Sequence, residues 1–206
     1  QGPGARSVSL QLEKFTLIGS TTRAGLLSAP LLDRFGIRCR LKYYNVDELA
    51  DIVNRSAGIL KIRIEDEGAM IIAKRSRGTP RIANRLLKLT RDLAIVKNKG
   101  VITADIAGES LDNWEIDHLG LDELVKKILM TIIDTYNGGP VGLNSIAVSV
   151  GEEPGTIEEV YEPFLVLEGF IRRTSRGREA TDLAYEHLGI TKKKAKGKIE
   201  NGLFDS

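Results

Sequence analysis

Two arginines stand in short motifs that could act on nucleotide phosphates. Arg34 lies in Pro30-Leu-Leu-Asp-Arg-Phe-Gly36, and a guanidinium at such a helix end could neutralise charge on a transferring γ-phosphoryl group. Arg81 lies in Arg77-Gly-Thr-Pro-Arg-Ile-Ala83, at the second position of an expected helix, where free backbone N–H groups also favour an anion. Ordinary structural roles remain open, because Arg34 can bridge Asp33 or cap the carboxyl end of a helix, and Arg81 can pair with an acid on a neighbouring helix.

The sequence has no loop that would cradle a nucleotide phosphate. Such a loop follows the pattern Gly-x-x-x-x-Gly-Lys-Ser/Thr, which wraps backbone N–H groups around the phosphates. The only Gly-Lys pair, Gly197-Lys198, is followed by Ile199 and has no correctly spaced glycine before it. His118 and His187 lack cysteine or carboxylate partners at ligand spacing, so no metal site is predicted. The arginines therefore predict one part of an ATP-driven machine.

Composition limits the class of protein. The 206 residues are 42% hydrophobic, which is enough for one large domain or two to three small ones. The 30 basic and 28 acidic residues give a net charge of +2, so any nucleic-acid surface has to be a local patch. Cys39 is the only cysteine, and neither a membrane span nor a secretory segment is found, so we expect a soluble, cytoplasmic protein. Because residue 1 is Gln1, we expect a processed or partial sequence.

Residues 1–44 have the pattern of the tail of a sheet domain. Alternating or compact apolar runs predict short strands over 7–12, 15–19 and 37–41. Three short strands do not complete a sheet, so partners or a larger domain would supply the rest. Thr22 follows the second strand, at the edge where open α/β sheets bind ligands, and its hydroxyl could read a γ-phosphate. Thr and Gly after a strand are also common turn residues.

Residues 45–118 change to helical periodicity and predict a small helical domain. The segment Asn45-Val-Asp-Glu48 has the capping-box pattern at the start of the first helix. A later helix is expected to be capped by Thr79, with Pro80 at its first position. Two others are predicted over 65–75 and 103–114.

Residues 119–190 predict a winged helix-turn-helix domain. The expected order is three helices and a hairpin, over 121–136, 143–150, 156–168 and 169–178. The hairpin carries four arginines, Arg172, Arg173, Arg176 and Arg178. They would contact phosphates rather than read bases, although a solvated loop is the ordinary alternative. Residues 191–206 are rich in lysine and are expected to be a disordered tail, so the fold class predicted overall is an α/β remnant followed by mainly α domains.

Five motifs in this order resemble the RuvB family of bacterial Holliday-junction branch-migration motors. They are Phe15-Thr-Leu-Ile-Gly-Ser-Thr-Thr-Arg-Ala-Gly25, Asp33-Arg-Phe-Gly36, Arg77-Gly-Thr-Pro-Arg-Ile-Ala-Asn-Arg85, Gly138-Gly-Pro-Val-Gly-Leu143 and Arg176-Gly-Arg178. The resemblance extends from about residue 2 to residue 190. The family usually has Arg where this chain has Leu32 and Pro where it has Ser175, and neither departure removes a named role. The family's amino-terminal part, with its phosphate loop and Walker B acids, is not in this sequence.

The resemblance implies the carboxyl-terminal part of an AAA+ large domain over 1–44, a helical lid over 45–118 and a winged-helix domain over 119–190. It also implies roles for single residues. Thr22 would be the first sensor, Arg34 the finger acting on the adjacent subunit, and Arg81 the second sensor. Tyr44 and Pro80 would pack near the adenine, and the wing with Arg173, Arg176 and Arg178 would contact DNA.

The function implied by the resemblance is ATP-dependent branch migration in recombination, repair and the SOS response. The family forms a hexameric ring that uses ATP and Mg²⁺ to pull duplex DNA through its centre at Holliday junctions, together with RuvA and RuvC. Without a phosphate-loop lysine and a magnesium-binding acid, the 206-residue chain alone is not expected to hydrolyse ATP. The alternative is a noncatalytic DNA-binding adaptor or inhibitor built from the lid and the winged helix.

Overall fold

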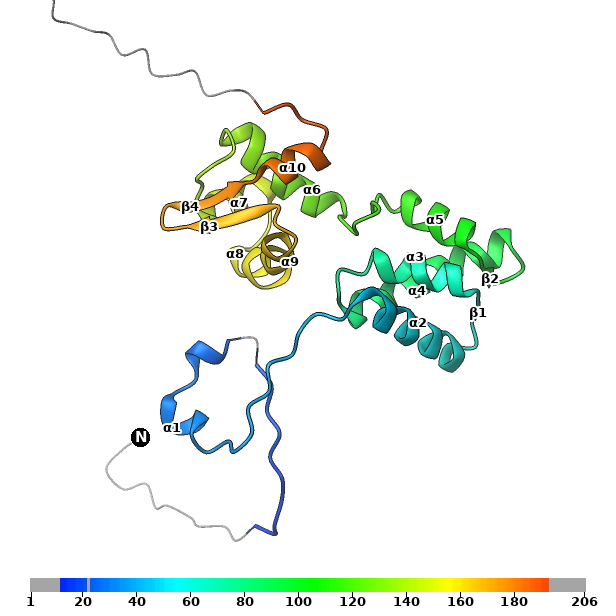
Figure 1. Ribbon diagram of the computed structural model, residues 1–206, viewed down its shortest axis with the longest axis horizontal. Helices are drawn as coiled ribbons and strands as arrows, with labels where there is room; N and C mark the ends of the chain where they lie inside the picture. Colours follow the sequence, from blue (N-terminus) through cyan, green and yellow to red (C-terminus); the bar gives the residue numbers. More distant parts are fainter. Residues whose placement is uncertain (1–11, 22, 193–206) are drawn as a thin grey trace, which may run out of the picture. The chain divides into compact units, whose positions relative to one another are not determined.

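The computed structural model describes residues 12–21 and 23–192 and divides the chain into two units, Gln1–Arg40 and Leu41–Ser206 (Figure 1). The described part of the first unit contains one 3₁₀ turn, η1 (Ala24–Leu26), and one short helix, α1 (Ala29–Leu32). Among the described residues, no helix is both long and apolar enough to cross a membrane.

Two of the three strands predicted for the first unit are not formed. Within residues 12–21 and 23–41 there is no strand, so the predictions over 15–19 and 37–41 are wrong. The strand predicted over 7–12 lies outside the described residues except for Leu12. A strand needs neighbours that complete its backbone hydrogen bonds and cover its side chains, and here Ile18 and Ile37 stay 88% and 84% exposed.

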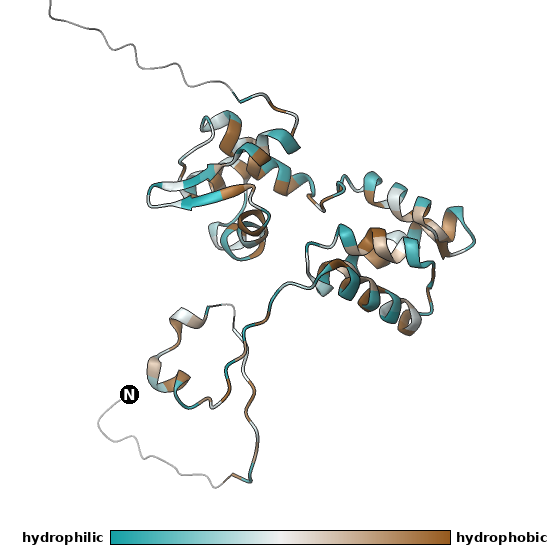
Figure 2. Cartoon of the chain, in the orientation of Figure 1, coloured by the Kyte–Doolittle hydropathy of each residue, from teal (hydrophilic) through white to brown (hydrophobic). Residues whose placement is uncertain are grey.

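The second unit begins with four helices around one core, as the helical periodicity predicted. They are α2 (Val46–Leu60), α3 (Asp66–Lys74), α4 (Pro80–Lys97) and α5 (Ala104–Asn113). Their buried faces meet in a cluster that includes Leu49, Val53, Ile72, Leu86 and Leu111. In Figure 2, brown hydrophobic stretches alternate with teal hydrophilic ones along these helices. We call α2 to α5 the helical domain.

A small parallel sheet in the helical domain was not predicted. Strand β1 (Arg63–Ile64) pairs with β2 (Val101–Ile102) in the register Arg63↔Val101. Two residues are too few for alternation to be visible in the sequence.

The capping predictions had different outcomes. The capping box is confirmed, since the Asn45 side chain accepts from the Glu48 N–H at 2.8 Å and the Glu48 carboxylate accepts from the Asn45 N–H at 2.9 Å. Thr79 stands at the N-cap of α4, but its side chain does not cap the helix. Its hydroxyl instead donates to the Arg77 carbonyl at 3.1 Å, because the turn before α4 brings that oxygen within reach.

The rest of the second unit has the order of a winged helix-turn-helix, as predicted. The first helix is α6 (Glu123–Met130), continued by a π turn, η2 (Thr131–Thr135), and the second is α7 (Leu143–Val150). The third is built from α8 (Pro154–Thr156), a π turn, η3 (Ile157–Tyr161), and α9 (Glu162–Leu167). The π turn η3 ends at Tyr161, two residues before Pro163, which has no N–H for a regular helical bond.

An antiparallel hairpin and a last helix complete this domain. The hairpin is formed by β3 (Ile171–Thr174) and β4 (Gly177–Ala180), and α10 (Asp182–His187) follows, which was not predicted. We call α6 to α10 the winged-helix domain. The hairpin predicted over 169–178 has a tight turn, because Thr174 pairs with Gly177 and leaves only Ser175 and Arg176 at the tip. Arg178 therefore lies in a strand, opposite Arg173.

Candidate nucleotide-sensing turn and DNA-contacting wing

The turn between α3 and α4 has a backbone that only certain residues tolerate. Arg77 and Gly78 both have left-handed conformations, with φ of 51° and 66°. A Cβ on Gly78 would lie 2.7 Å from the Tyr43 Cβ, closer than carbon atoms approach. The turn is closed by a hydrogen bond from the Thr79 N–H to the Ser76 carbonyl at 3.0 Å. A glycine is therefore required here by both conformation and space.

This turn brings together three of the predicted nucleotide-binding residues. The Tyr44 N–H donates to the Gly78 carbonyl at 3.0 Å, so the segment before α2 is held against the turn. Pro80 and Arg81 are the first two residues of α4, whose first N–H groups have no side-chain cap. Arg81 is exposed, and Tyr44 is 46% exposed. An anion near the helix start would meet both the guanidinium and free N–H groups.

Arg34 is exposed and stands one residue past Asp33, the C-cap of α1. The Asp33 carboxylate accepts a hydrogen bond from Arg38 at 3.1 Å, and no ion pair between Asp33 and Arg34 is found in the described residues. The ordinary explanation of Arg34 as the partner of Asp33 is therefore not observed. Thr22 lies outside the described residues. The catalytic roles of Arg34 and Thr22 stay predictions.

The wing is fixed on the winged-helix domain by close backbone contacts. Val141 and Arg178 exchange two backbone hydrogen bonds of 2.9 Å and 2.8 Å, which form an antiparallel bridge to the hairpin. Gly177 has φ of 139°, and a Cβ there would lie 2.3 Å from the Val141 carbonyl oxygen. The wing therefore has one defined orientation relative to α7.

Two of the wing arginines bind a buried carboxylate. Glu162, at the start of α9, has a side chain only 2% exposed. It accepts hydrogen bonds from Arg178 Nε and Nη2, both at 3.0 Å, and from Arg173 Nε. Burial raises the pKa of Glu162, but hydrogen bonds from Arg173 and Arg178 lower it more, so the pKa lies below the ordinary value and the group is charged at neutral pH.

The three arginines predicted to contact DNA thus have different environments. The Arg178 side chain is 18% exposed and its guanidinium is paired with Glu162. The Arg173 side chain is 52% exposed and pairs with the same carboxylate. Arg176 is exposed at the tip, and no hydrogen bond or ion pair of its guanidinium is found in the described residues. Arg176 is therefore the arginine of this set that is most available to a phosphate.

The third helix of the motif is acidic. In a helix-turn-helix protein this helix usually enters the major groove. Residues 151–170 contain no lysine or arginine. They contain six glutamates, Glu152, Glu153, Glu158, Glu159, Glu162 and Glu168. The phosphates that line a groove repel such a helix, so between the third helix and the wing it is the wing that offers positive charge to DNA.

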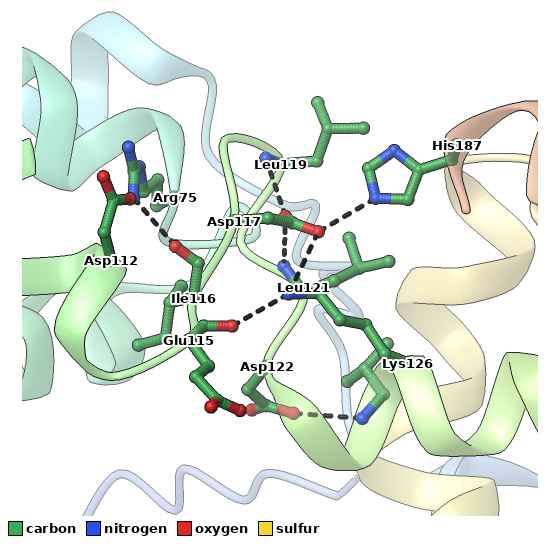
Figure 3. A network of polar contacts seen from close by, with 11 residues as sticks. Arg75, Asp112, Glu115, Ile116, Asp117, Leu119, Leu121, Asp122, Lys126 and His187 are labelled. Carbon is green, nitrogen blue, oxygen red and sulfur yellow. Dashed lines mark hydrogen bonds and ion pairs between the residues drawn. The ribbon is translucent and has the colours of Figure 1, made fainter. Parts of the chain in front are cut away.

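A polar network fixes the connection between the two domains (Figure 3). The Asp117 carboxylate accepts from the backbone N–H groups of Leu119 and Leu121, at 3.0 Å and 2.9 Å, and lies 2.9 Å from His187 Nε2. Burial raises the pKa of Asp117, but the hydrogen bonds from Leu121, His187 and Leu119 and the charge of Lys126 lower it more. Asp117 therefore holds the start of the winged-helix domain to its last helix, α10.

Arg77 was not predicted as a functional residue, yet it lies at the domain junction. Its side chain is 7% exposed, with Nη2 3.4 Å from Asp122 Oδ2 and Cζ 5.6 Å from the centroid of the Phe164 ring. Burial lowers the pKa of the Arg77 guanidinium, and Asp122 opposes this shift. Arg75, in the same turn, donates to the Ile116 carbonyl at 2.8 Å. The turn that precedes Arg81 thus also contacts the winged-helix domain, through Arg77.

Of the three residues that were not predicted, Asp117, Glu162 and Arg77, only the first has a recognisable local sequence pattern. Asp117-His-Leu-Gly120 is a typical turn pattern in which a carboxylate accepts backbone N–H bonds, so Asp117 could have been found. Glu162 and Arg77 have partners that are far away in the sequence, and nothing local marks them.

The part of the chain that the structure describes offers no site for a magnesium ion. Among the described residues, no group of three His, Cys, Asp or Glu side chains could hold a metal ion. The site residues described above offer cationic and backbone N–H groups, which suit phosphate oxygens and not Mg²⁺.

Three consecutive segments of the chain match models of one protein family. Residues 1–41 match the Holliday junction DNA helicase RuvB P-loop domain, and residues 44–117 match the RuvB AAA lid domain. Residues 118–189 match the RuvB C-terminal winged helix domain.

Solved structures of RuvB from Thermotoga maritima also resemble this chain. The chain is 52% identical to the Thermotoga maritima RuvB Holliday junction branch migration motor, with a TM-score of 0.78. A single-substitution variant of that protein gives 53% identity and a TM-score of 0.80. These matches cover 82% and 84% of this chain but only 57% of each Thermotoga chain.

Proposed function

The chain belongs to the RuvB family, and from this membership we propose that it forms part of an ATP-dependent motor that drives branch migration of Holliday junctions. In this motor the winged-helix domain binds duplex DNA, and the turn before α4 responds to the bound nucleotide.

The division of charge within the winged-helix domain carries the DNA-binding part of the proposal. The third helix is acidic, whereas the wing presents Arg176 at its tip, with Arg172 and Arg173 exposed beside it. Contact through a wing of this kind goes to the phosphate backbone and is largely independent of sequence. A motor that moves along DNA needs this property, because each step places a different sequence under the same residues.

The nucleotide part of the proposal assigns separate roles to the arginines. Arg81 senses the γ-phosphate of the ATP bound to its own subunit, and Tyr44 and Pro80 pack near the adenine. Arg34 acts on the ATP of the adjacent subunit, where it neutralises charge in the transition state, and Thr22 reads the same phosphate as a first sensor. ATP with Mg²⁺ is the nucleotide, and no phosphate-loop motif for it occurs in these 206 residues.

The assembly proposed is the one typical of the family. It is a cytoplasmic homohexamer that acts on four-way junctions with RuvA and RuvC, in recombination, repair and the SOS response.

Binding to DNA of different sequences tests the DNA-binding role. Labelled duplexes of unrelated sequence and a four-way junction would be titrated with the 206-residue chain at several salt concentrations. Similar affinities for all duplexes are expected, and the logarithm of the affinity should fall linearly with the logarithm of the salt concentration. A marked preference for one duplex sequence, or affinity insensitive to salt, would contradict contact through phosphates.

Magnesium-dependent ATP hydrolysis by the same chain tests the nucleotide role. No turnover is expected, because the sequence lacks the phosphate-loop lysine that stabilises phosphoryl transfer. Turnover comparable with that of an intact motor would refute this expectation. The alternative function, a noncatalytic adaptor or inhibitor, rests on the same missing lysine. Addition of the chain to a separately produced P-loop fragment distinguishes the two, because a split motor recovers activity and an inhibitor does not.

A further inference from the structure

Arg77 belongs to neither of the proposed sites, but its backbone is part of the nucleotide-sensing turn. It directly precedes Gly78, and its carbonyl accepts the Thr79 hydroxyl at 3.1 Å. Its left-handed conformation, with φ of 51°, leaves little freedom to rotate independently of Gly78. A displacement of the turn that carries Arg81 therefore displaces Arg77.

The Arg77 side chain extends into the winged-helix domain. Its Nη2 lies 3.4 Å from Oδ2 of Asp122, and the Asp122 Oδ1 caps α6 by accepting from the Val125 N–H at 3.1 Å. Its Cζ lies 5.6 Å from the ring centroid of Phe164 on α9, within the range of a cation–π interaction. One side chain thus contacts both the first and the third helix of the DNA-binding motif.

Helix α9 extends this contact to the wing. Glu162 stands two residues before Phe164 on the same helix and binds Arg178 of β4 through two hydrogen bonds of 3.0 Å. A continuous series of contacts therefore connects Gly78 through Arg77, Phe164 and Glu162 to the wing.

Two donors of Arg77 remain unused in this arrangement. Its Nε and Nη1 atoms are buried, and neither has a hydrogen-bond partner in the described structure. Buried donors are nearly always paired, and a charged donor that is not paired is costly. The unpaired donors raise the free energy of the present contact, so a displacement of the turn costs less than it would from a fully paired arginine.

We propose that Arg77 is a positioning residue that couples the nucleotide-sensing turn to the DNA-contacting wing, so that a shift of the turn changes the affinity of the wing for duplex DNA. This inference rests on the proposed DNA-binding function of the wing. Coupling of this kind is a free energy between two sites, so a double-mutant cycle measures it directly.

The cycle uses the complete 206-residue chain and needs no nucleotide. Gly78→Ala displaces the turn, because the added Cβ would lie 2.7 Å from the Tyr43 Cβ at a φ of 66°. Arg77→Met removes the charged group but keeps an unbranched apolar chain beside Phe164. Duplex affinity would be measured for the unchanged chain, both single variants and the double variant. In the unchanged background, we expect Gly78→Ala to weaken duplex binding about fivefold or more. In the Arg77→Met background, the same Gly78→Ala change should alter duplex affinity by less than about twofold.

Matched controls separate coupling from general effects. Gly58→Ala adds a Cβ on α2 with no heavy atom within 4 Å, and Arg55→Met removes an exposed arginine from the same helix. Neither is expected to change the response to Gly78→Ala. Circular dichroism and thermal unfolding check that each variant is folded, and Arg77→Lys replaces Arg77→Met if the latter does not fold.

The outcomes are distinct. Equal effects of Gly78→Ala in both backgrounds would overturn the coupling while leaving the DNA-binding function intact. No duplex binding by the unchanged chain would overturn both.

Discussion

The Glu162 carboxylate binds the Arg178 guanidinium through Nε and Nη2, with two hydrogen bonds of 3.0 Å. The two residues are 16 positions apart and belong to α9 and β4. Because the carboxylate is 2% exposed, this pair fixes the wing to the third helix of the motif. Arg178 is therefore expected to support the wing, while Arg176 is free to reach a phosphate.

Glu162→Gln should destabilise the winged-helix domain. The change removes the charge that Arg173 and Arg178 share and leaves Arg178, only 18% exposed, with weaker acceptors. We expect the free energy of unfolding to fall by about 1–3 kcal/mol, as for a lost hydrogen bond to a charged group. Urea denaturation followed by circular dichroism measures it. Glu168→Gln, at an exposed position after the same helix, is the control, and an equal loss in both variants would show that Glu162 has no special role.

Arg176→Ala and Arg178→Ala should have different effects. Arg176→Ala should weaken duplex binding and reduce the slope of log affinity against log salt by about 1, without loss of stability. Arg178→Ala should instead lower the melting temperature, because Glu162 loses its bidentate partner. Fluorescence anisotropy at several salt concentrations and thermal unfolding measure these effects. If Arg55→Ala, on α2, weakened binding as much as Arg176→Ala, the wing would not be the contact.

Asp117 should make stability depend on pH in the acid range. Its folded-state pKa is lowered from the ordinary 3.8, so its contribution is fully present above that value and is lost as pH falls through the lower folded-state pKa. Asp117→Asn should therefore cost most stability at pH 5 and above, and the difference from the unchanged chain should shrink as pH falls below the ordinary value of 3.8. Denaturation across this range measures the difference. Asp51→Asn, an exposed carboxylate of α2, is the control, and a difference independent of pH would contradict the assignment.

Gly177→Ala should disturb the wing. Gly177 has φ of 139°, and a Cβ would lie 2.3 Å from the Val141 carbonyl oxygen, so the hairpin has to move away from Val141. We expect a loss of about 1 kcal/mol or more in the free energy of unfolding, together with weaker duplex binding. Gly155→Ala is the matched control, because a Cβ there meets no heavy atom within 4 Å and the residue is helical. Unchanged stability of the Gly177→Ala variant would mean that the wing is not held at Val141.

The helices were predictable because their signals are local. The capping box of Asn45 and Glu48, the acids at the start of α3 and Pro80 at the first position of α4 each depend on residues within one turn. The order of helices and hairpin after residue 120 followed in the same way. The motifs that place the chain in the RuvB family are also short runs of sequence, so the family could be inferred before the fold was known.

The strands of the first unit show the limit of such signals. An apolar run such as 15–19 has the composition of a strand, but a strand forms only when another strand is beside it. The described residues of this unit provide no such neighbour, and Ile18 stays 88% exposed. Composition alone could not decide the outcome.

The sequence by itself determined the family, the helical segments and the identity of the exposed arginines. Tertiary structure alone decided which charges meet. Glu162 and Arg178 are 16 residues apart, Arg77 and Asp122 are 45 apart, and Asp117 and His187 are 70 apart. Such pairs depend on how helices pack and on the register of the hairpin, and no local pattern encodes either. For this reason the functional arginines could be named from the sequence, but the residues that position them could not.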